Sequence, residues 1–315
     1  MSKIVHLSST NSSLVLKIGD MPEILHWGQR LHIIDADLLA ATERAVSQAR
    51  LDTDIPLTLC PESGRGLFSA PGIEGHRAGK DWAPVFSLID EQITEHRAVF
   101  TATDEIVALR LTIELQLDQH SDVLQKRMTV TNITANDQPY TLNKLSNTLS
   151  LPAFATELMT FFGSWIREFH TERRDLMHGS FIQENRRGRT SHENFPGLMV
   201  GSKGFSEQSG EVYGFHLGWS GNHQLRVDAK SDGRRFLQAG ELLLPGEMIL
   251  APGESYTTPW LYGTFSTDGL NGLSCRFHQF VRNEILHFPA TTPNHRCRPV
   301  HLNTWEGIYL SLIHI

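Results

Sequence analysis

Alternation of apolar and polar residues is the clearest pattern in this 315-residue chain. Between Leu109 and Leu117 every odd position is apolar and every even position is polar. Successive side chains of a strand point to opposite faces, so this pattern predicts a β-strand with one face on a hydrophobic core. Arg127–Asn132 continues the pattern after a turn at Asp118–Ser121, which predicts an antiparallel pair.

Shorter strand-like stretches recur along the chain and are separated by turn residues such as Gly-Asp, Asp-Gly and Pro-Gly. The predicted strands lie at residues 13–18, 23–27, 141–151, 211–219, 224–229, 241–244 and 256–265. Many short strands at this spacing are typical of an all-β antiparallel sandwich.

Two stretches depart from this pattern and favour helices. Residues 37–50 are rich in Ala, Leu and Glu, with Asp37 as a candidate N-cap, although a loop is the alternative. Apolar residues at helical spacing follow Asp268, the candidate N-cap of a second helix that ends before Pro289. Residues 51–84 contain too many Gly and Pro residues for regular structure, and a loop of that length in a compact domain is usually functional.

Composition narrows the range of functions. The 28 Lys and Arg residues against 35 Asp and Glu residues give a net charge of −7 without a block of like charges, which disfavours nucleic-acid and anionic-membrane partners. A hydrophobic content of 40% excludes wholesale disorder. The first residues lack the apolar segment of a signal peptide, and we find no apolar run long enough to span a membrane, so we expect a cytoplasmic protein.

Motifs that would indicate a nucleotide, a metal or a hydrolase nucleophile are absent from the sequence. It has no Gly-x-Gly-x-x-Gly, no Walker loop, no Gly-x-Ser-x-Gly and, despite 16 histidines, no His-Glu-x-x-His. The three cysteines are distant from one another and odd in number, which favours neither a disulfide framework nor a metal site. We therefore expect no cofactor and no metal.

Residues 163–196 carry the most distinctive chemistry. Trp165 offers a flat apolar face of the kind that stacks on a sugar ring, and Arg187, Arg189 and Asn194 offer planar groups that bond hydroxyls. Two alternatives stay open: Trp165 is a core aromatic, and the Arg-rich segment is a solvated turn whose side chains organise the loop. Trp27 and Trp219 lie in apolar strand patterns, and we expect both to pack in the core.

Several segments, spread in order over nearly the whole chain, resemble the microbial α-galactosidases of glycoside hydrolase family 36. They are Gly163-Ser-Trp165, Arg186-Arg-Gly-Arg-Thr-Ser-His192 with Asn194, Gly210–Phe215, Ser220-Gly-Asn222, Leu250–Tyr256, Gly269–Leu273 and Arg298–Glu306. Each short match alone is weak, whereas their combination is specific.

The resemblance implies a domain order. Residues 1–267 would form a large antiparallel β-supersandwich of the galactose-mutarotase-like type, and residues 268–297 a linking helix and connector. Residues 298–315 would be the start of a truncated (β/α)8 TIM-barrel catalytic domain, including its first strand.

The resemblance also implies substrate-binding residues. Trp165 matches a Trp that the sandwich contributes to galactose binding, often across a subunit contact in a tetramer. Either Asp52 or Asp54 matches an Asp that binds a sugar hydroxyl, with Asp52 favoured, and Trp305 would lie near the substrate at the first barrel strand. The expected partners are an α-galactoside oligosaccharide, such as raffinose or melibiose, and further copies of the chain in a homo-oligomer.

The catalytic residues are expected to be missing. A retaining glycosidase uses two carboxyl groups about 5 to 5.5 Å apart. The family has both in the barrel, the nucleophile in a Lys-x-Asp-Met-Asn-Arg motif, and neither Lys80-Asp-Trp nor Lys230-Ser-Asp continues in that way. We therefore expect an inactive N-terminal portion of an α-galactosidase, from a truncated or frame-shifted product.

Two other functions remain as alternatives. One is a non-catalytic carbohydrate-binding or assembly module that holds a galactoside through Trp165 and the Arg-rich loop. The other is a sugar epimerase with His192 and Glu193 as acid and base, which is disfavoured because neighbouring residues of a strand face opposite sides.

Overall fold

The alternating strand pair predicted from the sequence lies within the largest sheet. In the computed structural model, which describes residues 3–42, 55–287 and 300–303, β7 (Leu109–Leu117) runs antiparallel to β8 (Leu124–Asn132). Every odd-numbered residue of β7 is buried. The prediction of a strand with one face on a core is confirmed.

This sheet has ten strands, and every described pairing in it is antiparallel. Its order is β12-β11-β14-β15-β20-β8-β7-β6-β5, with β19 paired beside β8. The other members are β5 (Ser87–Ile93), β6 (Arg97–Asp104), β11 (Glu157–Ser164), β12 (Arg167–Asp175), β14 (Gly197–Gly201), β15 (Val212–Leu217), β19 (Ser255–Thr257) and β20 (Leu261–Ser266).

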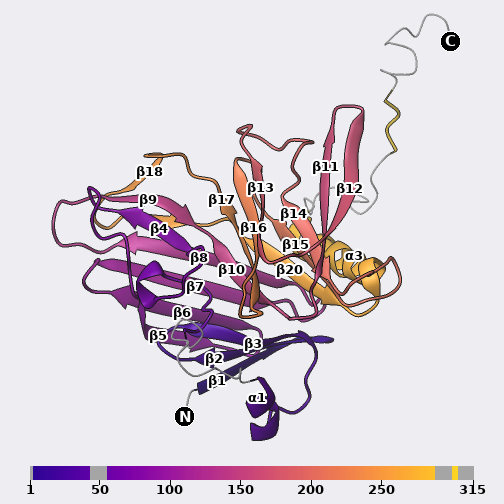
Figure 1. Ribbon diagram of the computed structural model, residues 1–315, viewed down its shortest axis with the longest axis horizontal. Coiled ribbons are helices and arrows are strands. Elements are labelled where there is room, and N and C mark those ends of the chain that lie inside the picture. Colours follow the sequence, from indigo (N-terminus) through magenta and orange to yellow (C-terminus); the bar gives the residue numbers. More distant parts are fainter. Residues whose placement is uncertain (1–2, 43–54, 288–299, 304–315) are drawn as a thin grey trace, which may run out of the picture. The chain divides into compact units, whose positions relative to one another are not determined.

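Three smaller antiparallel sheets accompany it (Figure 1). One has four strands in the order β10 (Asn147–Leu151), β17 (Arg235–Glu241), β16 (His223–Ala229) and β13 (Gly179–Asn185). The three-stranded sheets are β1 (Lys3–Ser8), β2 (Ser12–Ile18) and β3 (Pro22–Gln29), and β18 (Met248–Leu250), β9 (Tyr140–Leu145) and β4 (Ile73–His76). The predicted all-β antiparallel class is confirmed.

Several predicted strand boundaries were wrong. The stretch 141–151 is divided at Ser146, because β9 and β10 pair in different sheets. The stretch 256–265 is likewise divided into β19 and β20. No strand covers 241–244 as predicted, since β17 ends at Glu241. Periodicity cannot reveal such breaks, because the pairing partner of a strand is set by tertiary structure.

One large hydrophobic core joins the sheets. Leu111 of β7, Met128 of β8, Leu149 of β10 and Leu237 of β17 belong to it. Trp27 is buried there as predicted, whereas Trp219 leaves 38% of its surface exposed, so the prediction that it packs in the core was wrong. The Tyr213 hydroxyl donates to the Trp27 carbonyl oxygen over 2.6 Å and so connects β15 to β3.

One of the buried residues of β8 is a lysine, Lys126. The Lys126 amine donates to the carbonyl oxygens of Leu59 and Thr148 at 2.5 and 2.7 Å. Its side chain is fully buried, and this burial lowers the pKa of Lys126 to about 7. Removal of a charge from water is costly, so the neutral amine is the form that suits this site.

The helices begin differently from the predictions. In α1 (Ala36–Thr42) the N–H of Leu38 donates to the carboxylate of Asp35 over 2.9 Å, so Asp35 and not Asp37 is the N-cap. In α3 (Gly269–Phe280) the N–H groups of Leu270 and Asn271 donate to the carbonyl oxygens of Ser206 and Glu207 instead of to Asp268. Residues 43–50 of the first predicted helix lie outside the described residues.

Two further helical segments are short. One is η1 (Ser63–Arg65), within the loop predicted for residues 51–84, and the other is the π-helix η2 (Val281–Ile285). The chain divides into two compact units, Met1–Phe280 and Val281–Ile315, so α3 belongs to the first. No helix among the described residues is long and apolar enough to cross a membrane.

Within the first unit, a buried carboxylate connects α3 to two turns between strands. Asp122 accepts hydrogen bonds from the hydroxyl of Ser9 and the backbone N–H of Asn11, at 2.7 and 2.8 Å. Its other oxygen lies 3.4 Å from the guanidinium of Arg276 on α3. A single side chain thus ties the β1–β2 turn, the β7–β8 turn and the helix together.

Candidate functional site

Trp165 lies at the tip of a hairpin. β11 and β12 pair with Ser164 opposite Arg167, so Trp165 and Ile166 form a two-residue connection, and the hairpin is seen near the upper right of Figure 1. Trp165 exposes 76% of its surface and Ile166 exposes 66%. The alternative that Trp165 is a core aromatic is therefore wrong, and its indole is free for contact with another molecule.

A bulge sets the direction of this tip. Glu168 and Phe169 of β12 together oppose Gly163 of β11, where the register shifts. A Cβ atom at residue 163 would lie 2.3 Å from the carbonyl oxygen of Arg167, so only glycine fits there. Ile166 has a positive φ of 69°, which is unusual for a β-branched residue. The two residues of the turn are Trp165 and Ile166, so the sequence lacks the Asn-Gly pair that is the strongest short-range signal of a hairpin.

Three phenylalanine rings pack together beside the bulge of the hairpin. The ring centroid of Phe169 lies 5.4 Å from that of Phe161 and 4.9 Å from that of Phe195, and Phe161 lies 5.6 Å from Phe195. Phe195 in turn lies 5.3 Å from the ring of His216 on β15. The sequence analysis missed this cluster, because its members are far apart in the chain and only strand pairing brings them together.

The Arg-rich loop beside the hairpin is organised largely by its own side chains. The Arg187 guanidinium donates to Glu193 over 2.7 Å, and the Asn194 amide donates to the Glu184 carbonyl oxygen over 2.8 Å. Arg189 contributes its carbonyl oxygen, which accepts a hydrogen bond from Asn185 over 2.8 Å. Arg187 and Asn194 thus help to shape the loop, and contact of the loop side chains with a sugar remains a prediction.

Three carboxyl groups of this region, those of Glu168, Glu184 and Glu193, have lowered pKa values. The N–H groups of Glu168 itself and of Ile166 lower the pKa of the Glu168 carboxyl, and the Arg187 guanidinium lowers the pKa of Glu193. Burial would raise the pKa of Glu184, but hydrogen bonds from Arg186 and Gln224 outweigh it and the pKa falls. A general acid needs a raised pKa, so none of these groups is suited to protonate a leaving sugar.

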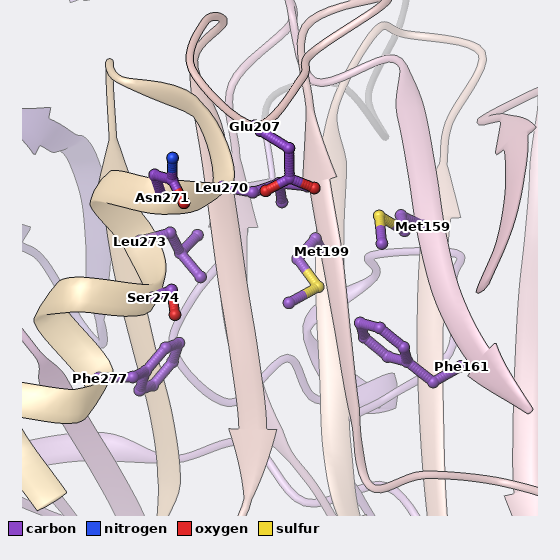
Figure 2. Close-up of a pocket in the computed structure, with 9 residues that line it drawn as sticks. All are labelled: Met159, Phe161, Met199, Glu207, Leu270, Asn271, Leu273, Ser274 and Phe277. Carbon is purple, nitrogen blue, oxygen red and sulfur yellow. The ribbon is translucent and has the colours of Figure 1, made fainter. Parts of the chain in front are cut away.

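The described part of the chain contains two hollows that could admit a small molecule. The first, of about 320 Å³, lies between α3 and strands β11 and β14, and Figure 2 shows Phe161, Met199 and Leu273 around it. The second, of about 400 Å³, is bordered by Trp27 and Tyr213. Among their described lining residues the first has one carboxylate, Glu207, and the second has one, Glu211. Neither offers the pair that glycoside hydrolysis requires.

Asp52, Asp54 and Trp305 lie outside the described residues, so Trp165 is the one predicted sugar ligand that the structure places. The first barrel strand expected after residue 298 also lies mostly outside them. Within the described part of the chain, no group of three or more His, Cys, Asp or Glu side chains could hold a metal ion.

Comparison with known families gives two matches that follow each other along the chain. The glycosyl hydrolase family 36 N-terminal domain matches residues 20–251, and the Melibiase family matches residues 255–313. An α-galactosidase from Escherichia coli is 49% identical over 311 residues, which is 99% of this chain and 43% of that protein. The chain thus spans less than half the length of this curated relative.

Solved structures agree on the fold. The GH36 α-galactosidase AgaA from Geobacillus stearothermophilus, in a variant complexed with raffinose, superposes with a TM-score of 0.85 at 23% identity over 98% of this chain and 46% of the other. An α-galactosidase from Lactobacillus brevis gives a TM-score of 0.79 at 21% identity over 89% of this chain and 41% of the other. From the family match over most of its length, this chain belongs to glycoside hydrolase family 36.

Proposed function

We propose that this chain is the N-terminal part of an α-galactosidase, a retaining glycoside hydrolase that removes terminal α-galactosyl residues from oligosaccharides such as raffinose and melibiose. The observation that carries the proposal is the exposed Trp165 on a hairpin of a family 36 domain. The 49% identity to the E. coli α-galactosidase and the raffinose bound to an AgaA variant support this substrate class.

Trp165 would stack its indole on the apolar face of a galactosyl ring. An exposed aromatic gains most from such a contact when its own backbone is already fixed, because little conformational entropy is then lost on binding. The bulge at Gly163 and the packing of Phe169 on Phe195 supply that rigidity. Hydroxyl binding by Asp52 or Asp54 and a contact from Trp305 remain predictions.

The proposed chemistry needs a pair of carboxyl groups that neither of the two hollows offers among its described lining residues. Glu168 and Glu193 have lowered pKa values, and each of the two hollows has a single described carboxylate. We therefore propose that residues 1–315 bind and position the sugar and do not hydrolyse it. The proposed division is a supersandwich at 1–267, a linking helix and connector at 268–297 and the start of a catalytic barrel at 298–315.

Two further expectations of this proposal concern assembly with other copies of the chain and location in the cell. The chain would act in a homo-oligomer, in which Trp165 of one copy reaches the substrate of another. The high exposure of the hairpin tip supports such a contact, because its apolar surface has no partner among the described residues of its own copy. A cytoplasmic location remains a prediction from the sequence.

Turnover and binding by the 315-residue chain test this function. We expect no hydrolysis of an aryl α-galactoside, and weak raffinose binding that Trp165→Ala abolishes. The matched control is Ile106→Ala, since Ile106 is also an exposed apolar residue, at 94%, and lies far along the chain from the hairpin. Hydrolysis that depends on Trp165 would contradict the proposal, because catalytic carboxylates would then have to lie in this chain.

One alternative function is supported by the same observation. An exposed Trp165 without a pair of suitable carboxylates also fits a carbohydrate-binding or assembly module that works without a catalytic domain. Raffinose affinity distinguishes the two, because a lone aromatic with one rim of polar groups binds poorly without an enclosing pocket. Tight binding by the 315-residue chain alone would favour the module.

A further inference from the structure

The turn that carries Trp165 has a backbone conformation that its own residues do not favour. Ile166 has a positive φ of 69°, whereas Trp165 is not among the described residues with a positive φ. A positive φ at the second turn residue alone is the pattern of a type II turn, which ordinarily has Gly or Asn at that position. A β-branched side chain is strained there. The tip of the hairpin is therefore a strained conformation.

The strands of the hairpin do not favour this turn either. Two-residue hairpins prefer turns of types I′ and II′, in which the first residue has a positive φ, because the twist of these turns matches that of the strands. Phe169, at the bulge of β12, also has a positive φ, of 58°. Strained residues persist where surrounding contacts hold them, so Ile166 and Phe169 need such contacts.

Glu168 lies between these two residues in the sequence and supplies a contact to the turn. Its carboxylate accepts a hydrogen bond from the N–H of Ile166 over 2.8 Å. Its own N–H, the N–H of Ile166 and the nearby His192 lower the pKa of the Glu168 carboxyl, so the group is ionised at neutral pH. A hydrogen bond to an ionised acceptor is stronger than one between neutral groups.

This hydrogen bond acts on the backbone of Trp165. The N–H of Ile166 belongs to the peptide plane that follows Trp165, so a bond to it restricts rotation about the Cα–C bond of Trp165. The rotamers open to a side chain depend on the backbone dihedral angles of its residue. The packing of Phe169 on Phe195 holds the strand below the turn, whereas Glu168 holds the turn itself.

We propose that Glu168 is a positioning residue for Trp165, which fixes the turn so that the exposed indole is presented to a galactosyl ring in one orientation. This inference rests on the proposed function, in which Trp165 stacks on the sugar. An aromatic side chain that is already ordered loses less conformational entropy on binding. Strain at the tip of an exposed hairpin is explained if the turn conformation itself serves binding, because Gly or Asn at residue 166 would relieve it.

Amide hydrogen exchange tests the hydrogen bond without any sugar. NMR of the 315-residue chain with isotope-labelled isoleucine follows the N–H of Ile166, whose signal is identified by its absence from Ile166→Val. We expect this N–H to exchange about five-fold faster in Glu168→Ala than in the wild type. Glu168→Gln keeps an acceptor oxygen and should restore most of the protection. An unchanged exchange rate in Glu168→Ala would overturn the proposal, because the carboxylate would then not hold the turn.

Raffinose binding tests the consequence for Trp165. The indole N–H signal of Trp165, identified by its absence from Trp165→Ala, is followed by NMR as raffinose is added. We expect Glu168→Ala to raise the dissociation constant about five-fold and Glu168→Gln to keep it within about two-fold of the wild type. The matched control is Glu172→Ala, which removes another exposed glutamate of β12 and should leave the affinity unchanged.

The outcomes separate this inference from the proposed function. Raffinose binding that is lost in Trp165→Ala but unchanged in Glu168→Ala would overturn the positioning role and leave the proposed function intact. Equal losses in Glu168→Ala and Glu172→Ala would also overturn it, because any acidic residue of β12 would then serve. A wild-type chain that binds no raffinose, or one whose binding survives Trp165→Ala, would refute the proposed function and the positioning role together.

Discussion

The middle of the ten-stranded sheet, at β7 and β8, and its end, at β11 and β12, differ in how deeply their side chains are buried. At β7 and β8, alternate residues are fully buried and the strands have neighbours on both sides. At β11 and β12, Phe162 and Ser164 of the first strand and all residues of the second are exposed, and the tip carries Trp165. The middle of the sheet is buried in the core, and its outer end is exposed, where we propose that it contacts other molecules. Mutations should therefore separate stability from binding along one sheet.

Leu111→Ala should have the largest effect on the middle. Leu111 is fully buried on β7, so its truncation leaves a cavity in the core. We expect the free energy of unfolding to fall by about 3 kcal/mol. Urea denaturation followed by tryptophan fluorescence measures it. A loss below about 1 kcal/mol would mean that the core can collapse around the missing side chain, and that the middle is less rigid than described.

Lys126→Met should change how stability depends on pH. Burial lowers the pKa of Lys126 to about 7, against 10.5 for an ordinary lysine. Between these values the unfolded chain binds the extra proton, so the stability of the native protein rises with pH there. We expect the wild type to gain about 1.4 kcal/mol per pH unit relative to the variant in this window. Unfolding curves at a series of pH values test it.

Lys126→Met should change both the pH dependence of the stability and the absolute stability, and only the first effect reports the protonation of Lys126. The variant also leaves the carbonyl oxygens of Leu59 and Thr148 without their donor, which costs the same at every pH. Parallel pH profiles for wild type and variant would show that Lys126 is charged in the folded core, contrary to what its burial implies.

Tyr213→Phe should have a moderate effect. It removes the hydroxyl that donates to the Trp27 carbonyl oxygen and leaves that oxygen buried without its donor. We expect a loss of about 1 to 2 kcal/mol in the free energy of unfolding. Phe265→Leu is a suitable comparison, because Phe265 stacks on the same tyrosine ring but offers no hydrogen bond. Chemical denaturation of both variants distinguishes loss of the hydrogen bond from loss of packing.

Trp165→Ala should have the smallest effect on stability. The side chain is mostly exposed, so we expect a change within about 0.5 kcal/mol and an unchanged melting temperature. Thermal unfolding measures it beside the raffinose-binding assay. A large destabilisation would place Trp165 with the core residues and remove the contrast between the two parts of the sheet.

Local patterns predicted much of the fold but little of the site. The limits of β7 follow from the alternation of Leu109–Leu117, because that strand has one buried face along its whole length. β12 shows no such alternation, since both of its faces are exposed, and the sequence analysis did not identify it as a strand. The support of Trp165 by Phe161, Phe169 and Phe195 depends on pairing between distant strands, which no local pattern contains.

The sequence by itself determined the all-β antiparallel class, the β7–β8 pair and the family, because side-chain alternation and short motifs are local properties of the chain. Tertiary structure alone decided that Trp165 is exposed, that Lys126 is buried and that β12 is left as an edge. The physical reason is that burial and edge position depend on which strands pair, and these pairings join residues far apart in the sequence. The residues next to a Trp or a Lys in the sequence can be the same whether its side chain is buried in the core or exposed at the surface.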